Sequence, residues 1–516
     1  MTHPPRRTVL MGLALIGLLA ATSCTSAVDL TGSTAGAGPK RGGTLRIVQS
    51  ADIAPNNVLA QNNVNLAFLR LVYNTLTEYD HVTRAPKPAL AESWLVSPDG
   101  TVVDLKLRQG VTFHSGRAFT ADDVVFTLDH IRRDDVPSQL KHVAKALDKV
   151  EKTGEHGVKL TFAKPLANVF DLFELMFILD RDSADRIKSG TFVGTGPFKL
   201  DSYAPGASIK LSRNDKYWKD DSPYLDGVEI AIVRQSQSML SSLRAKQSQL
   251  ALDLAPLDAA SLRNDPAFEV VVADNHDSAF YIGHNTTVAP LTDPKVRQAV
   301  AWAVDRDRIL QQVLGGIGRT SSLPWAPGSS AFDESLAGTY KRDIAKARKL
   351  LTEAGALGTP IDVSYNAGLP TNAAIAEIVG FDLGEAGFTA RTVPLQGPDF
   401  QARLTGDGLP GLFVNNHGFG QLDPATLVKG AFPFNADKNA ARFDDAEYKR
   451  LAEALWTTVD PAAQKERYAE LNRFLLDRQF ITDLVVSSHT YTVDRTLGGL
   501  GYTMFGYVDL DHAFLR

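Results

Sequence analysis

Alternating hydrophobic and polar positions predict several β-strands in the first half of the chain. In WLVSPDGTVVDLKLR, the residues Val103, Leu105 and Leu107 alternate with polar residues after a Pro-Asp-Gly turn, which is typical of a hairpin. GTLRIVQS predicts the first strand of the folded part, from about residue 43. Further runs that predict strands are 158–162, 208–213, 228–233 and 268–272.

Helical periodicity is clearer in the second half. DIAKARKLLTEAG begins on Asp343 and ends on Gly355, residue types that cap the two ends of a helix. DPAAQKERYAELNRFLLDR begins in the same way on Asp460. In TDPKVRQAVAWAV we expect Thr292 to cap the helix and Pro294 to occupy its first turn. Strands and helices alternate without an obvious repeat, which predicts an α/β fold whose sheets combine distant segments.

The start of the chain has the pattern of an export signal. The basic start MTHPPRR precedes VLMGLALIGLLAA, a charge-free apolar run that is short for a membrane span. Small residues then lead to Cys24, so residues 1–24 are predicted to be a signal peptide. Arg6 and Arg7 leave both general and twin-arginine export open. Residues 25–42, rich in Gly, Ser, Thr and Ala, are predicted to be a flexible tether.

Cys24 is the only cysteine, so no internal disulfide can form. Its position at the end of the signal resembles the lipid-attachment site of bacterial lipoproteins, although Ala21 stands where leucine is usual. We therefore expect a lipid anchor on Cys24 that holds the protein on the extracytoplasmic face of a membrane.

Length and charge narrow the function. A chain of 516 residues is long enough for two or three lobes. The 54 basic and 59 acidic side chains give a formal charge of −5, which offers no basic face for nucleic acid.

The stretch VTFHSGRAFTADDVVFTL holds His114, Asp122 and Asp123 close together. Thr120 and Asp123 have the spacing of a capping box, and both aspartates fall in the first turn of a predicted helix, where the helix dipole favours negative charge. No further metal ligand follows at a suitable spacing. We interpret the cluster as structural rather than catalytic.

Sequence signatures of enzymes are absent. The chain has no G-x-S-x-G nucleophile motif and no H-E-x-x-H or C-x-x-C motif. GTGPFK lacks the spacing of a phosphate-binding loop, and GGIGRT, residues 315–320, is better explained as the end of a helix. We therefore expect a binding protein without catalytic residues, metal or cofactor.

Three long motifs carry a family resemblance. LAESWLVSPDGTVVDLKLRQGVTFHSGRAFTADDVVFTLDHI (90–131), GTGPFKLDSYAPGASIKLSRNDKYW (194–218) and HNTTVAPLTDPKVRQAVAWAVDRDRIL (284–310) resemble, in order, the family-5 extracellular solute-binding proteins. These are the oligopeptide- and dipeptide-binding components of ABC importers. The resemblance extends from about residue 42 to the end of the chain.

The resemblance implies an α/β bilobed clamp of the periplasmic-binding-protein type II, in the peptide-binding cluster, with an extra domain in the first lobe. The expected parts are a first lobe of residues 43–65, 193–283 and 488–516, an extra domain of 66–192 and a second lobe of 284–487. Such a clamp captures a solute between its lobes and closes around it.

The implied function is delivery of a peptide or related small polar solute, by a monomer, to an ABC permease and ATPase complex. A non-transport lipoprotein that uses the same clamp as a sensor or envelope assembly factor is the alternative.

The resemblance also indicates where the solute would bind. Peptide-binding members often hold the ligand's ammonium with the first aspartate of W-x-x-D-Y-x-D-P. Here the matching run is HGFGQLDP, in which Gly420 replaces that aspartate, His417 replaces the tryptophan, and Asp423 matches the last one. A buried ammonium without a partner costs several kcal/mol, so Gly420 weakens the case for a free peptide amino end unless another acid substitutes.

Neutral groups near this run suit other solutes. Asn415, Asn416 and His417 could bind a polyol, a sugar-like ligand, a modified peptide or a metal chelate. With Phe419 and Asp423 they form the candidate site in the second lobe, and Ser50 and Asp52, just after the first strand, are the candidates in the first lobe. Four aromatic residues are candidates for ligand stacking, Trp302, Trp325, Phe419 and Tyr203, although core packing is the better interpretation of Trp302.

Overall fold

The computed structural model describes residues 39–55, 59, 63–138, 140–274, 276, 278–406, 408–420 and 422–516. The predicted signal peptide, Cys24 and most of the predicted tether lie outside these residues. Within these ranges, no helix combines the length and the apolar character needed to cross a membrane.

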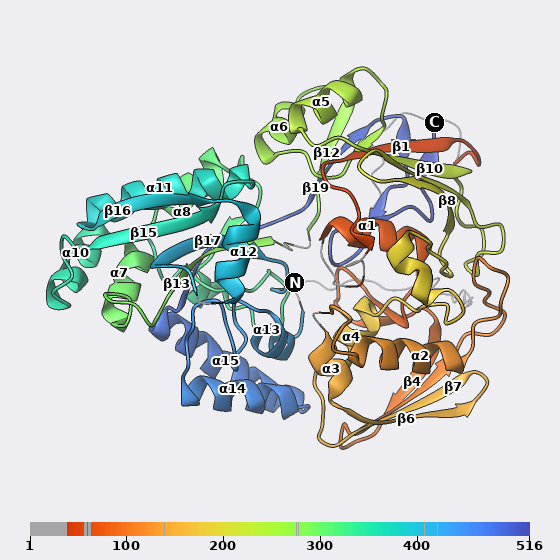
Figure 1. Ribbon diagram of the computed structural model, residues 1–516, viewed down its shortest axis with the longest axis horizontal. Helices are drawn as coiled ribbons and strands as arrows, with labels where there is room; N and C mark the ends of the chain where they lie inside the picture. Colours follow the sequence, from red (N-terminus) through yellow and green to blue (C-terminus); the bar gives the residue numbers. More distant parts are fainter. Residues whose placement is uncertain are drawn as a thin grey trace, which may run out of the picture. The chain divides into compact units, whose positions relative to one another are not determined.

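The first large sheet has seven strands in the order β12-β19-β11-β1-β10-β9-β8 (Figure 1). Its strands are β1 Thr44–Gln49, β8 Phe198–Ala204, β9 Ser208–Arg213, β10 Gly227–Ile232, β11 Leu250–Ala251, β12 Phe268–Val272 and β19 Thr490–Asp494. β1 is parallel to β10 and β11, and the remaining pairs are antiparallel. The predicted strands at 208–213 and 268–272 are confirmed.

Both faces of this sheet are buried, because side chains of β1 alternate between two apolar clusters. Leu45 and Ile47 belong to a large cluster that also includes residues of α1 (Asn63–Val72). Val48 belongs to a second cluster, which α5 (Ser236–Arg244) and α6 (Pro256–Ser261) complete.

A four-stranded antiparallel sheet in the order β4-β5-β7-β6 extends the first cluster. Its strands and the helices beside it are β4 Ala91–Val96, β5 Val102–Leu107, β6 Leu147–Gly154, β7 Gly157–Phe162, α2 Ala121–Arg132, α3 Lys141–Lys145, α4 Val169–Leu175 and the 3-10 helix η2 Ala184–Ser189. β4 and β5 form the predicted hairpin. Short two-stranded pairs are β2 Thr77–Tyr79 with β3 Pro86–Pro88, β20 Leu497–Gly498 with β23 Phe514–Leu515, and β21 Gly501–Tyr502 with β22 Val508–Asp509.

The second large sheet has six strands in the order β14-β18-β13-β17-β15-β16 (Figure 1). Its strands are β13 Ser278–His284, β14 Arg319–Thr320, β15 Pro360–Asn366, β16 Thr389–Leu395, β17 Leu412–His417 and β18 Ile481–Ser487. β15 is parallel to β16 and β17, and the other pairs are antiparallel.

Helices cover both faces of the second sheet. They are α7 Pro294–Ala303, α8 Arg306–Gln312, α9 Glu334–Ala337, α10 Ile344–Glu353, α11 Pro370–Ala386, α12 Gly397–Thr405, α13 Pro424–Gly430, α14 Ala446–Thr457 and α15 Pro461–Arg478. Ile282 and Val414 face a cluster with α7, α8, α10 and α11. Tyr281 and Phe413, one residue away on the same strands, face a cluster with α13, α14 and α15.

The helix caps follow the sequence with one exception. Asp343 and Asp460 cap α10 and α15 as predicted, accepting hydrogen bonds from the N–H groups of Lys346 and Ala463. The prediction that Thr292 caps α7 is wrong. Asp293 is the cap, because it directly precedes Pro294, and its carboxylate accepts from Lys295 N–H at 2.8 Å.

The polar cluster near α2 has the structural role that the sequence predicts. Asp123 Oδ2 accepts a hydrogen bond from Thr120 N–H at 3.0 Å, and its carboxylate pairs with Arg117. His114 Nε2 lies 3.0 Å from the carbonyl oxygen of Gly196, and burial lowers its pKa to about 4, so the ring is neutral. The described residues include no group of three or more His, Cys, Asp or Glu side chains that could hold a metal ion.

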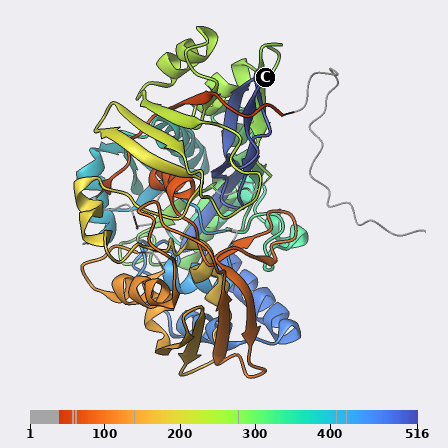
Figure 2. The same ribbon diagram turned by 90° about the vertical axis from the view of Figure 1, so that its right-hand side faces the viewer.

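The chain crosses from the first large sheet to the second before residue 283, where the sequence analysis placed the boundary between the lobes. We expected the first lobe to extend to residue 283, but β13 pairs with β17 and β18 in the second sheet. The reason is that every residue of β13 after Ser278 is buried between these neighbours. After the second sheet, β19 returns to the first sheet (Figures 1 and 2). Near the end of the chain, Leu515 lies next to Gly43, the residue before β1.

Candidate functional site

Two segments connect the lobes side by side. The first lobe here means the seven-stranded sheet with the four-stranded sheet beside it, and the second lobe means the six-stranded sheet with its helices. One segment lies between β12 and β13 and the other between β18 and β19, and Ala273 N–H donates to the carbonyl of His489 at 2.9 Å. Adjacent connections of this kind form a hinge.

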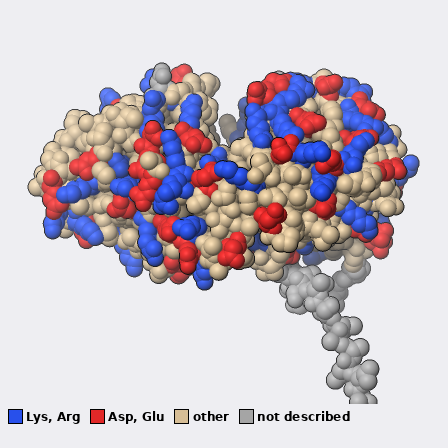
Figure 3. All heavy atoms as spheres, turned by 90° about the horizontal axis from the view of Figure 1, so that it is seen from below, with Lys and Arg blue, Asp and Glu red and all other residues tan. Residues whose placement is uncertain are grey.

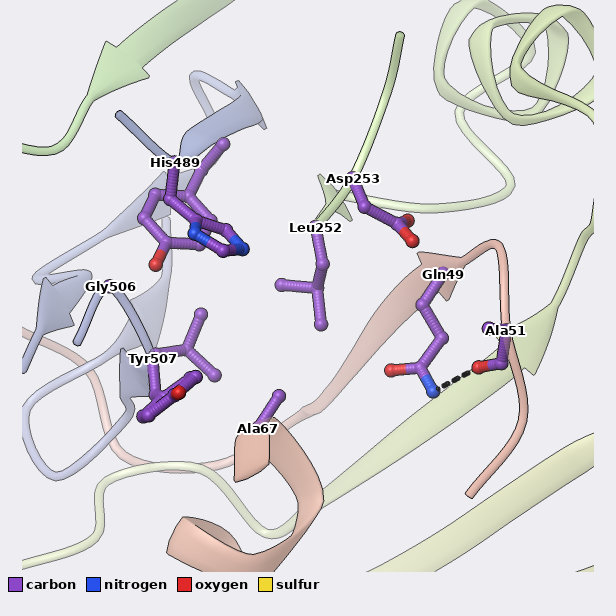
Figure 4. Close-up of a pocket in the computed structure, with 10 residues that line it drawn as sticks. Gln49, Ala51, Ala67, Leu252, Asp253, His489, Gly506 and Tyr507 are labelled. Carbon is purple, nitrogen blue, oxygen red and sulfur yellow. Dashed lines mark hydrogen bonds between the residues drawn. The ribbon is translucent and has the colours of Figure 1, made fainter. Parts of the chain in front are cut away.

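A cavity of about 80 Å³ lies on the first-lobe side of this hinge (Figure 4). Its lining includes Gln49, Ala51, Leu252, Asp253, His489 and Tyr507. Because β1 and β11 are parallel, their C-terminal ends reach the same edge of the sheet. The cavity therefore forms where two parallel strands end and the returning strand β19 begins.

Among the described residues of the lining, Asp253 is the only acidic one, and Ser50 fixes its orientation. Ser50 N–H donates to Asp253 Oδ1 at 2.9 Å and to Oδ2 at 3.1 Å, and the Ser50 hydroxyl donates to Oδ2. Asp253 is exposed to solvent. Surrounding protein raises the pKa of Asp253 above its ordinary value, while the Ser50 hydrogen bonds and the charge of His489 oppose this rise.

The structure separates the two first-lobe candidates. Ser50 lies beside the cavity, between the lining residues Gln49 and Ala51. Asp52 instead ties the end of β1 to the β8–β9 hairpin, because its Oδ2 accepts from Tyr203 O–H at 2.9 Å and from Gly206 N–H at 2.6 Å. These bonds hold Tyr203 in place as well.

In the second lobe, three of the candidates are the last residues of β17, and Phe419 and Asp423 follow the strand. Asn415 and Asn416 are half-buried and lie opposite Tyr281 and Phe280 in the register with β13. His417 is buried, with its ring centroid 5.9 Å from that of Tyr281 and 5.2 Å from that of Phe434.

His417 is held as a neutral ring. Its Nδ1 accepts from Phe419 N–H at 3.2 Å, and burial lowers its pKa to about 3. Its Nε2 has no hydrogen-bond partner within the described part of the chain. His417 therefore acts as a packed element of the loop in this conformation.

Gly420 has no room for a side chain. A Cβ atom there would overlap the carbonyl oxygen of Pro324, and the Gly420 carbonyl accepts from Ala326 N–H at 3.0 Å. Trp325, between them in sequence, is fully buried and donates from Nε1 to Asn472 Oδ1 at 2.6 Å. The backbone at Gly420 therefore packs directly on the backbone of residues 324–326. In this packing only glycine fits at position 420, where peptide-binding members often have aspartate.

The same loop touches the first lobe. Phe419 packs against the apolar clusters of both lobes, and Leu422 belongs to the cluster of the first lobe. Trp302, in contrast, lies on α7 against Tyr340, with a centroid separation of 4.9 Å, which agrees with core packing. Of the aromatic candidates, Phe419 is the one in contact with both lobes.

Asp423 joins the lobes through a pair of carboxylates. Its side chain caps α13 by accepting from Ala425 N–H at 2.8 Å, and its own N–H donates to Asp171 Oδ2 at 3.1 Å. Asp171, on α4 of the first lobe, also accepts from Tyr79 O–H at 2.8 Å and from the Thr426 hydroxyl. Burial raises the pKa of both carboxyls, and the charge of Asp171 raises that of Asp423 further.

Other contacts continue this interface. Asn168 Nδ2 donates to Thr426 Oγ1 at 2.6 Å, and Lys164 pairs with Glu453 at 2.9 Å. Basic and acidic side chains are interspersed on the face shown in Figure 3. That face therefore carries no extended field of a single sign.

Sequence reasoning missed Asp253. It follows a strand of only two residues, which has no recognisable period, and its neighbours in the cavity come from distant segments. The available signal was an aspartate directly after the short apolar run LALDL, a position at which strands of α/β sheets often place ligand-binding side chains.

Comparisons with known proteins agree with this architecture. Residues 85–439 match the family model described as bacterial extracellular solute-binding proteins, family 5. Di/tripeptide-binding protein 1 of Pseudomonas aeruginosa is 28% identical over 473 residues, which cover 84% of this chain and 87% of that protein. Heme-binding protein A of Haemophilus influenzae is 30% identical over 417 residues, with 74% and 75% covered.

A solved structure shows the same fold. The oligopeptide-binding protein AppA from Bacillus subtilis, in complex with a nonapeptide, has a TM-score of 0.80 and 23% sequence identity, covering 93% of this chain and 100% of that one. The expected α/β bilobed clamp is thereby confirmed.

Proposed function

We propose that this chain, which belongs to the bacterial extracellular solute-binding proteins of family 5, captures a small solute between its two lobes and delivers it to an ABC permease and ATPase complex. Proteins of this family bind solutes and are not enzymes. The observation that carries the proposal is the cavity with Asp253 at the hinge, where motion of the lobes would open or close access to it.

The solute we propose is a peptide or a related small polar molecule. The relatives named above bind di- and tripeptides, heme and a nonapeptide, so the fold itself is compatible with several ligands. In the second lobe, Gly420 has no room for a side chain and His417 is buried, whereas the first-lobe cavity presents a carboxylate. Asn415 and Asn416 remain candidates for contact with the solute when the lobes open.

The remaining parts of the proposal concern location and assembly. We propose residues 1–24 as a signal peptide, 25–42 as a tether, and a lipid anchor on Cys24 that holds a monomeric clamp at the extracytoplasmic face. The first lobe would comprise 43–65, the segment from 193 to the crossing before β13, and 488–516. The extra domain, 66–192, would supply α4, which contacts α13 of the second lobe.

Native mass spectrometry tests the proposal. The full chain is expressed with its signal, extracted in mild detergent from cells grown in rich medium, and sprayed intact. We expect added masses from retained solute, because closure of the lobes slows release. A bare protein whose unfolding temperature also does not rise with peptide or sugar mixtures would contradict solute capture and favour a sensor or envelope assembly role.

A further inference from the structure

The cavity beside the hinge has the chemistry to select one group of the solute. We infer that Asp253 receives a protonated amino group of the solute in this cavity, an inference that rests on the proposed function. The amino group would then bind to the first lobe, at the end of β11, rather than at position 420 of the second lobe.

The size and lining of the cavity set the first limit. About 80 Å³ is room for the end of a ligand and not for a whole peptide. Apolar Ala51 and Leu252 line part of the wall, and Asp253 supplies its only carboxylate (Figure 4). A small group that carries hydrogen-bond donors and positive charge fits this lining.

The bonding of Asp253 gives the second argument. A carboxylate has about four positions for accepting hydrogen bonds. Ser50 N–H and the Ser50 hydroxyl occupy positions on both oxygens, and they hold the carboxylate at a fixed angle. Oδ1 can still accept a further hydrogen bond. Among the described residues, only Ser50 N–H donates to it.

Electrostatics favour a cation over a neutral donor. The surrounding protein raises the pKa of Asp253, and a positive charge beside it acts in the opposite direction, as the charge of His489 already does. A protonated amino group would add a charge-assisted hydrogen bond to the ionised carboxylate. A metal ion is a weaker explanation, because no cluster of three or more metal-binding side chains occurs in the described ranges. A primary ammonium needs one carboxylate and a few further acceptors; Asp253 supplies the carboxylate, and the side chain of Gln49 also lines the cavity.

The second lobe supports the same conclusion by exclusion. A side chain at position 420 would collide with the Pro324 carbonyl, so no carboxylate can be placed there without moving the backbone. Asp423 is occupied as the cap of α13 and as a neighbour of Asp171. Asp274, which follows Ala273 at the hinge, is exposed but does not line the cavity, whereas Asp253 does.

The test compares Asp253→Asn with Asp201→Asn in the full detergent-extracted chain. Asp201 is an exposed aspartate on β8 of the same lobe, bonded to Ser212, and it does not line this cavity. Retained solute is extracted from each protein, and primary amines are detected by reductive methylation and mass spectrometry. Binding of trialanine and of N-acetyl-trialanine is measured in parallel by calorimetry.

The expected result is a retained solute with an amino group, which Asp253→Asn loses and Asp201→Asn keeps. Trialanine, if it binds, should bind Asp253→Asn at least about tenfold more weakly, and the ratio between free and acetylated peptide should fall toward one. A purely structural role of Asp253 would weaken both peptides equally and leave that ratio unchanged.

Three results would overturn the inference. A retained solute without a basic nitrogen, or equal retention by Asp253→Asn, would remove the role of Asp253 while leaving solute capture in place. If Asp253→Asn left the ratio between the affinities for free and acetylated trialanine unchanged, the role of Asp253 would likewise be removed. A protein that retains nothing and binds neither peptide would remove the inference together with the proposed function.

Discussion

The end of β1 and the loop after β17 are the regions where the two lobes offer polar groups, and they are built in opposite ways. At the end of β1, side chains surround an open cavity and a serine holds an aspartate ready to accept. At the end of β17 and in the loop after it, His417 is buried and the backbone of Gly420 packs on that of Pro324. Phe419 and Leu422 pack against the apolar cluster of the first lobe. Under the proposed function, the second-lobe loop would serve closure and the first-lobe edge would serve recognition.

The largest expected effect comes from filling the second-lobe loop. Gly420→Ala forces a Cβ atom against the Pro324 carbonyl, and both partners are backbone, so neither can rotate away. We expect a loss of about 3 kcal/mol or more in the free energy of unfolding, measured by urea denaturation.

Gly384→Ala is the matched control for that substitution. Gly384 lies within α11, and a Cβ atom there meets no atom within 4 Å. Alanine should stabilise this helix by about 0.5–1 kcal/mol. Equal effects of the two substitutions would show that position 420 has room for a side chain. The second-lobe loop would then not be more tightly packed than the open end of β1.

The next effect concerns pH and the carboxylates that join the lobes. The pKa of Asp171 is raised to about 6 and that of Asp423 to about 7, from ordinary values of 3.8. Carboxyls with raised pKa values favour the packed form when protonated. That contribution is therefore full below about pH 4 and is lost as the pH rises through 6 to 7.

Asp423→Asn should remove most of this dependence. Asparagine still caps α13, so the helix end stays intact, while the like charge beside Asp171 disappears. Relative to the wild type, the variant should gain about 2 kcal/mol in the free energy of unfolding between pH 5 and pH 8. The control is Asp445→Asn, the half-buried cap of α14. If the stability of Asp423→Asn and of the wild type changed equally with pH across this range, Asp423 would not be a source of the pH dependence.

A smaller loss of stability is expected when the hydrogen bond of the buried Trp325 side chain is removed. Trp325→Phe removes the Nε1–H that donates to Asn472 Oδ1, which leaves a buried acceptor without that donor. We expect a loss of about 1–2 kcal/mol in the free energy of unfolding, measured by urea denaturation, and unchanged solute affinity. A loss of affinity with unchanged stability would instead assign Trp325 to solute binding.

Much of the fold could be predicted from residue patterns, because its signals are local. Asp343 and Asp460 mark their helices, and the turn after Pro98 marks its hairpin. The error at Thr292 arose because two adjacent residues can both cap, and only the chain direction before Pro294 decides between them. The position of β13 could not be read locally, since its partners β17 and β18 lie far along the chain.

The site was less predictable, because it is made by distant segments. Ser50 could be proposed from its place after the first strand, and it lies next to the cavity. Asp253 gave no periodic signal, and only the parallel pairing of β1 with β11 brings it to Ser50. Gly420 was visible as a departure from the family pattern, but its cause, the Pro324 carbonyl, requires the three-dimensional packing.

The smallest expected effect tests how firmly the first-lobe carboxylate is held. Ser50→Ala removes the hydroxyl that donates to Asp253 Oδ2 but keeps the N–H that donates to both oxygens. Affinity for an amine-bearing solute should fall about threefold, because the carboxylate loses one of the hydrogen bonds that hold it in place, and the pKa of Asp253 should rise further above its ordinary value. Calorimetry with the retained solute measures this change.

Ser212→Ala, which breaks the similar serine–aspartate contact with Asp201 on the outer strands, should leave affinity unchanged. Because the Ser50 backbone N–H alone keeps Asp253 oriented, a loss as large as that of Asp253→Asn would mean that Ser50 itself touches the solute. No loss at all would mean that the hydroxyl does not help to position the carboxylate. The intermediate value is what distinguishes a residue that positions the acid from one that binds the ligand.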